Sequence, residues 1–149
     1  QIVVIGLVFS VVTGGAVGYS RPGPNGAWQD NLGGREVRGG PAGGGYSTVG
    51  DLLRFARALL DGKIVRRQTL ELWTTVQSDR RGERDGYGFG FGIEYVGGRK
   101  VFGHSGGAPG MATNLWIVPA DGSVGVVLAN LDPPVVSPGM AVVKDLATK

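Results

Sequence analysis

The sequence predicts an α+β domain in which helices flank an antiparallel sheet. Apolar residues first recur at helical spacing after Thr48, and from Asp85 the apolar period changes to two. The later apolar runs are separated by strong turn signals, and strand and helix patterns do not alternate as they do in parallel sheets. Two helices, then four consecutive strands, then a last helix are therefore expected.

The first helix is expected between Thr48 and Gly62. Ser47 or Thr48 can cap its N-terminus, and Asp51 follows Thr48 at the spacing of a capping box. Gly62 provides a C-terminal stop. The apolar positions at helical spacing are Val49, Leu52, Leu53, Ala56, Leu59 and Leu60. This spacing gives the helix one apolar face to bury.

A second, shorter helix is expected over residues 67–76, with Leu70 and Trp73 facing inward. Apolar side chains then alternate with glycines over 85–95, which predicts a single strand with one aromatic face and one nearly bare face. The aromatic face is expected to be core, and the bare face allows close approach of another backbone or a helix. The alternating apolar residues are Tyr87, Phe89, Phe91, Ile93 and Tyr95.

Three more strands and a helix complete the expected order. Gly97-Gly98 predicts a hairpin turn, and Pro119-Ala120-Asp121-Gly122 predicts a second turn further on. The strands are expected at 99–104, 111–118 and 123–130. Three prolines then lead into a helix expected over residues 139–147.

The chain divides into an N-terminal segment, residues 1–46, and an α/β part, residues 47–149. Residues 1–12 are apolar but too short to span a bilayer, which takes about 20 residues. They are either a buried strand or the point where a longer protein was cut, and we favour the cut. Residues 13–46 are rich in Gly and Pro and read as loop. The sequence does not decide membrane association.

Composition excludes several classes of site. The net charge is +3, but the basic residues form no stripe interleaved with aromatics, so we expect no nucleic-acid partner. With no cysteine and one histidine, the chain has neither disulfides nor the spacing of a zinc site. We expect no metal and no cofactor. The 29 glycines have no collagen-like period and indicate tight turns and close backbone approaches.

The run from Gly103 to Gly107 matches G-x-S-x-G, the nucleophile elbow of α/β-hydrolases. An elbow joins a strand to a helix, but Ala108-Pro109-Gly110 cannot start a helix promptly. The elbow's triad also needs a histidine later in the chain, and the single histidine is His104. Adjacent residues on a strand point to opposite faces, so His104 cannot act as the base for Ser105. We reject the elbow.

Four motifs in order instead resemble the serine β-lactamase and penicillin-binding-protein-like hydrolases. This family includes class C β-lactamases, D-Ala-D-Ala peptidases and β-lactamase-like esterases. The resemblance covers the C-terminal half of such proteins and implies a partial β-lactamase/transpeptidase-like fold. The motifs are residues 43–53 (GGGYSTVGDLL), 87–90 (YGFG), 103–110 (GHSGGAPG) and 126–130 (VVLAN).

The resemblance also implies which functional groups this sequence lacks. In the family the nucleophilic serine and its lysine form an S-x-x-K motif, and a Y-x-N motif follows it. None of the seven serines here has a lysine three positions later, and no tyrosine has an asparagine two positions later. We expect this chain to be inactive on its own.

The resemblance makes His104, Ser105 and Gly106 the third motif, usually K-T-G, on a strand that lines the cleft. By the same resemblance the backbone N–H of Gly107 is a donor of the oxyanion hole. Histidine in place of lysine supplies no fixed positive charge near neutral pH, which favours ester or peptide-like substrates. Tyr19 is a further candidate for cleft lining, although a packing role is the simpler interpretation.

The first functional hypothesis is therefore part of a serine hydrolase. It forms an acyl-enzyme on small ester, amide or β-lactam substrates, bound by the full-length protein. The alternative is a truncated or degenerate homologue without catalysis, acting as a binding module or an incomplete product. The resemblance fits a periplasmic or secreted protein and also a cytoplasmic esterase, so it does not fix the compartment.

Overall fold

The computed structural model describes residues 2–4, 16–34, 40, 43–79, 86–132, 141, 144 and 145. Two helices precede a run of antiparallel strands, so the α+β prediction is confirmed. The elements are β1 (Ile2–Val4), β2 (Tyr19–Ser20), β3 (Gln29–Asp30), the 3₁₀ turn η1 (Leu32–Gly34), α1 (Val49–Leu60), α2 (Arg67–Trp73), β4 (Ser78–Asp79), β5 (Gly86–Tyr87), β6 (Gly92–Val96), β7 (Arg99–Ala108), β8 (Met111–Val118) and β9 (Ser123–Ala129).

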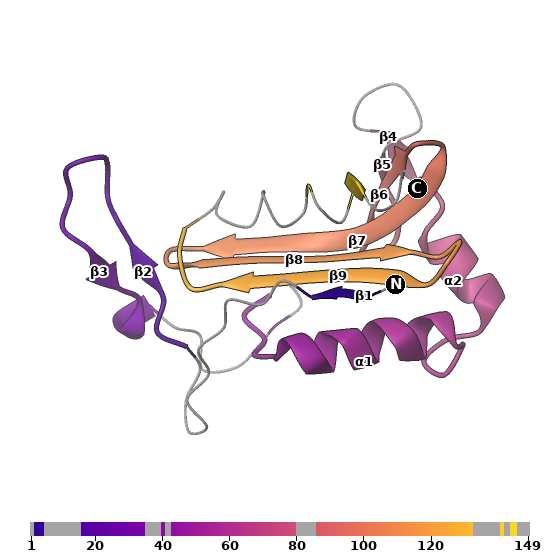
Figure 1. The fold of residues 1–149 in the computed structure, drawn as a ribbon, viewed down its shortest axis with the longest axis horizontal. Coiled ribbons are helices and arrows are strands. Elements are labelled where there is room, and N and C mark those ends of the chain that lie inside the picture. The colour runs from indigo at the N-terminus through magenta and orange to yellow at the C-terminus, as the bar shows by residue number, and fades with distance from the viewer. Residues whose placement is uncertain are drawn as a thin grey trace.

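A seven-stranded sheet forms the centre of the described structure, in the order β1-β9-β8-β7-β6-β5-β4. Every neighbouring pair is antiparallel except β1 and β9, which run parallel. Helix α1 lies alongside β9, and α2 lies near the same end of the sheet as the β8–β9 turn (Figure 1). A separate hairpin of β2 and β3 projects beyond the other end of the strands (Figure 1).

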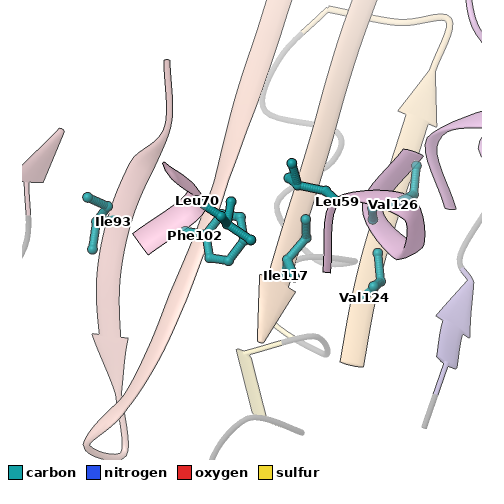
Figure 2. Packing of buried hydrophobic residues seen from close by; sticks show 8 residues of the cluster. Leu59, Leu70, Ile93, Phe102, Ile117, Val124 and Val126 are labelled. Atoms are coloured by element: carbon teal, nitrogen blue, oxygen red, sulfur yellow. The ribbon is translucent and has the colours of Figure 1, made fainter. Parts of the chain in front are cut away.

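The two faces of the sheet bury different apolar sets, as the pleat requires. The cluster on the helical face is Ala56, Leu59, Leu70, Ile93, Phe102, Ile117, Val124 and Val126 (Figure 2). The other cluster is Val101, Ala112, Trp116, Val118 and Val127. Successive residues such as Val101 and Phe102 therefore belong to opposite faces. Each fully buried Val, Leu, Ile or Phe stabilises the fold by about 1.5–3 kcal/mol relative to exposure.

Both helices form where the sequence predicts them. The Thr48 side chain caps α1 by accepting the Asp51 backbone N–H at 3.1 Å, and Gly62 ends it with a φ of +71°. Helix α2 stops at Trp73, three residues before its expected end at 76, and it buries Leu70 as expected. Trp73 is half-buried.

The single strand expected over 85–95 is wrong. The described part, 86–96, is a hairpin in which Tyr87 pairs with Gly92, and Gly90 turns the chain with a φ of +79°. Alternating glycines permit this turn because they lack a Cβ. The aromatic residues consequently do not share one buried face: Ile93 is 1% exposed, but Phe89 is 54% exposed.

The expectation that the glycine positions allow close approach of another backbone or a helix holds at Gly88. A Cβ there would lie 2.1 Å from the Trp73 carbonyl oxygen, so only glycine allows this contact with the end of α2.

The remaining strands follow the sequence closely. The turn at Gly97 and Gly98 has positive φ at both residues, and β8 and β9 form at the expected positions. Strand β7 continues to Ala108, beyond its expected end at 104, because its backbone still pairs with β8. Of the helix expected at 139–147, residues 141, 144 and 145 are described, and they are helical. Three short elements, β2, β3 and η1, interrupt the segment expected to be loop.

Candidate functional site

Strand β7 changes character halfway along its length. Val101, Phe102 and Gly103 are buried, whereas the five residues from His104 to Ala108 are exposed. Pairing with β6 ends where Gly92 meets Gly103. Among the described residues, the rest of β7 pairs with β8 alone. The third-motif residues thus lie on a strand with one open edge.

The ladder decides which backbone groups face that open edge. Pro109 and Gly110 form a two-residue turn that makes Ala108 and Met111 partners. In an antiparallel ladder alternate residues exchange hydrogen bonds with the partner strand. Every second residue of β7, counted back from Ala108, therefore exchanges backbone hydrogen bonds with β8. Ser105 and Gly107 therefore direct their N–H and C=O groups to the open edge.

His104 is held through both ring nitrogens. Its Nδ1 lies 2.5 Å from the Ser105 carbonyl oxygen, and its Nε2 lies 2.8 Å from the Tyr87 hydroxyl oxygen. A carbonyl only accepts, so Nδ1 carries the proton, and in the neutral ring Nε2 accepts from Tyr87. Both nitrogens are then engaged, which leaves the neutral imidazole of His104 no open lone pair for a general base.

Tyr87 is the site residue that sequence reasoning missed. Its ring meets the His104 ring edge to face, with centroids 5.7 Å apart and planes at 82°. The aromatic alternation assigned Tyr87 to the core, and no local signal ties it to His104, because the contact depends on the β5–β6 turn. Its sequence clue is a hydroxyl in an otherwise apolar stripe, a feature that Tyr95 shares.

A hollow of about 510 Å³ opens beside these two rings. It is lined by Gly86, Tyr87, Gly92, Ile93, Glu94, Gly103, His104, Ser105, Trp116 and Lys144. Gly103 is required in its floor, since a Cβ there would lie 1.9 Å from the Leu115 carbonyl oxygen. Glu94 and Lys144 form an ion pair at its rim, and the Lys144 ammonium lies 5.5 Å from the Trp116 ring centroid.

The structure brings some of the predicted site residues together and separates others. His104 and Ser105 line the hollow, whereas Gly106, Gly107 and Tyr19 are not among its lining residues. Tyr19 begins β2, is 41% exposed, and donates its backbone N–H to Asn130 beside the far end of β9. Ser105 lies within β7, which turns into β8 rather than a helix, so it does not occupy a nucleophile elbow.

Two negative findings apply to the described residues. No three His, Asp or Glu side chains in these ranges are close enough together to hold a metal ion. No helix in the same ranges is long and apolar enough to cross a membrane.

Known proteins show which family has this arrangement. The Beta-lactamase family matches residues 5–148. The chain belongs to the beta-lactamase family. The resemblance drawn from the four motifs is thereby confirmed, together with the partial fold that it implied. No curated protein matches the chain.

Three solved structures show how much of a family fold this beta-lactamase-family chain represents. A penicillin binding protein from Bacillus halodurans is 26% identical with a TM-score of 0.77, over 88% of this chain and 40% of its own. A D-stereospecific amidohydrolase from Streptomyces sp. is 26% identical with a TM-score of 0.69, over 92% and 41%. A D-amino acid amidase from Ochrobactrum anthropi, complexed with D-phenylalanine, shares the fold at 21% identity and a TM-score of 0.52, over 69% and 36%. The chain thus spans about two fifths of the length of these proteins.

Proposed function

We propose that this chain forms one wall of an acyl-transfer site in a serine hydrolase of the beta-lactamase family. The observation that carries the proposal is the open edge of β7, where the Gly107 N–H faces outward beside the exposed third motif. A backbone N–H fixed on a strand is suited to hydrogen-bond the oxyanion that develops when a carbonyl is attacked. His104, Ser105 and Gly106 then flank the substrate.

The reaction needs a nucleophile that these residues do not supply. A serine hydroxyl oxygen bonds to the substrate carbonyl carbon and passes its proton through a neighbouring base to the leaving alcohol or amine. Water then cleaves the acyl ester and restores the serine. The proposal therefore requires that the gene encode S-x-x-K and Y-x-N motifs in frame upstream of Gln1.

The substrate class follows from the state of His104. Both ring nitrogens of His104 are bonded, one to Tyr87 and one to the Ser105 carbonyl, so, unlike the usual lysine, the third motif offers no free cationic donor to a substrate carboxylate. Esters and peptide-like amides are the favoured substrates, ahead of β-lactams that rely on such a charge. The amidohydrolase and amidase among the similar structures are compatible with this class.

The test uses the protein from the whole reading frame. Gly107→Pro removes the proposed donor, and proline is tolerated where the N–H of an edge strand faces outward. We expect it to lower kcat for a chromogenic ester about 10²–10³-fold, as loss of one oxyanion donor does. Gly107→Ala is the matched control, because it retains the N–H.

Equal activity of the proline and alanine variants would remove Gly107 from the oxyanion hole. A whole protein that gives no burst of acylation with a fluorophosphonate would favour the alternative, a homologue that binds without catalysis. A reading frame that starts close to Gln1 would do the same.

A further inference from the structure

The turn that follows the third motif is held by side chains from two distant parts of the chain. Asp132 accepts the Gly110 backbone N–H at 2.7 Å through Oδ1 and the Arg21 backbone N–H at 3.1 Å through Oδ2. Asn31 donates from Nδ2 to the Pro109 carbonyl oxygen at 3.3 Å. Asn31 lies 78 positions from Pro109 in the sequence, and Asp132 lies 22 positions from Gly110.

We call the hydrogen bonds of Asp132 and Asn31 to the Pro109-Gly110 turn the clamp. Close backbone packing completes it. Asn31 also accepts the Gly18 N–H at 2.9 Å, which brings Gly18 against the turn. A Cβ at Gly18 would lie 2.2 Å from the Gly110 carbonyl oxygen, and one at Gly110 would lie 2.6 Å from the Gly18 carbonyl carbon. Because the two backbones touch without intervening side chains, the turn has little room to shift.

Gly107 depends on such a clamp. It is two residues from Pro109, its neighbour Gly106 is also a glycine, and one edge of the strand here is open. Glycine has more backbone freedom than any other residue, so this stretch does not fix its own geometry. Among the residues that the structure describes, the pairing with β8 and the anchored turn set the direction of the Gly107 N–H.

We propose that Asp132 and Asn31 are positioning residues for the Gly107 N–H; this inference rests on the proposed function. Neither residue lines the hollow, and both act through the turn at Pro109-Gly110. A donor displaced by a fraction of an ångström stabilises the oxyanion less but leaves substrate binding elsewhere intact.

The kinetic test again uses the protein from the whole reading frame. We expect Asp132→Ala to lower kcat roughly ten-fold, less than loss of the donor itself, with KM changed by less than about two-fold. Asp132→Asn keeps one acceptor oxygen, so it should recover much of kcat. Asp30→Ala is the matched control, because it removes a carboxylate beside Asn31 that bonds the Leu32 N–H and not the turn.

A second variant covers the case in which Asp132→Ala does not fold. Asn31→Asp keeps the acceptor for Gly18 but loses the donor to the Pro109 carbonyl. It should reproduce the fall in kcat with an unchanged KM. A normal kcat in folded Asp132→Ala or Asn31→Asp, beside an active parent, overturns the inference and leaves the proposed function standing.

An NMR measurement on this chain tests how rigidly the Gly107 backbone is held, without an activity assay. The ¹⁵N order parameter of Gly107 should be close to that of rigid backbone, about 0.85, and should fall towards 0.6 in Asp132→Ala. An unchanged value overturns the inference whatever the kinetics show. A parent protein without acylation, by contrast, is the failure of the proposed function.

Discussion

The sequence indicates the position of His104 in the third motif but not the side chain that it contacts. From the sequence it stands where the family usually has a lysine, and its neighbour Ser105 was excluded as an elbow nucleophile on local grounds. Those arguments need only the residues after Ser105 and the position of the single histidine. Its bond to Tyr87 could not be predicted, because the two side chains meet only once the β5–β6 hairpin and the β6–β7 ladder are both formed.

Tyr87→Phe tests the state of the His104 ring. Without the hydroxyl, Nε2 loses its donor, but the Ser105 carbonyl still requires a proton on Nδ1, so we expect the Nδ1–H tautomer to persist. Loss of an exposed hydrogen bond should cost about 0.5 kcal/mol of unfolding free energy, the lower end of the usual range. Long-range ¹H–¹⁵N NMR of the imidazole measures the tautomer, with Tyr95→Phe as the control. An Nε2–H tautomer in the parent chain would contradict the assignment.

Asp121, in the turn between β8 and β9, gives a pH-dependent prediction. Burial raises the pKa of this carboxyl, but the Ser123 backbone N–H and the Arg99 guanidinium outweigh that effect and set the pKa at about 2. A pKa lowered on folding stabilises the chain at pH values above the unfolded pKa of about 4. That contribution is lost as the pH falls from about 4 to about 2.

We therefore expect Asp121→Asn to lower the unfolding free energy by about 1 kcal/mol at neutral pH, a value reduced for solvent screening. The difference between parent and variant should shrink as the pH falls below about 4. Urea unfolding at a series of pH values measures it. A difference that stays constant from pH 7 to pH 3 would show that the carboxylate charge is not what stabilises the turn.

At the scale of elements, prediction succeeded where the signals are local. The cap, apolar spacing and stop glycine of α1 all lie within fifteen residues, and paired glycines mark the β6–β7 turn. The error over 85–95 has the opposite origin. A strict alternation with glycine fits a strand and also a tight hairpin, and the contact of Gly88 with the end of α2 decides between them.

The N-cap of α1 gives the clearest test at this scale. The sequence left Ser47 and Thr48 as alternatives, and the structure assigns the cap to Thr48. Thr48→Ala should lower the unfolding free energy by about 1 kcal/mol. Ser47→Ala should change it little, because the Ser47 hydroxyl bonds only the Thr48 carbonyl, at 3.4 Å. Thermal unfolding of both variants makes the comparison, and equal losses would rule out the assignment.

For the whole molecule, the fold class and the family were accessible because each motif carries its own signal and their order is fixed. The clamp around Pro109-Gly110 was not. Gly18, Asn31 and Asp132 are ordinary loop residues in the sequence, and the hydrogen bonds of Asp132 and Asn31 to the turn join positions 22 and 78 residues apart. Local patterns contain no information about those bonds.

The isolated chain gives a prediction at the same scale. With no S-x-x-K in the sequence, residues 1–149 should show no burst of acylation with a fluorophosphonate or a labelled penicillin. Mass spectrometry of the treated chain measures this directly. A single stoichiometric adduct on Ser105 would refute the assignment of Ser105 as cleft lining.

Strand β7 also determines how this protein can be altered. Its first half supplies buried side chains that the fold needs, and its second half supplies exposed residues that the fold does not bury. Under the proposed function, a combinatorial library at positions 104 and 105 would therefore vary residues that flank the substrate, at little risk to folding. The same diversity placed three positions earlier, at Val101 and Phe102, would mostly yield chains that do not fold. Within this one strand, a protein engineer should therefore keep the buried first half and vary the exposed second half.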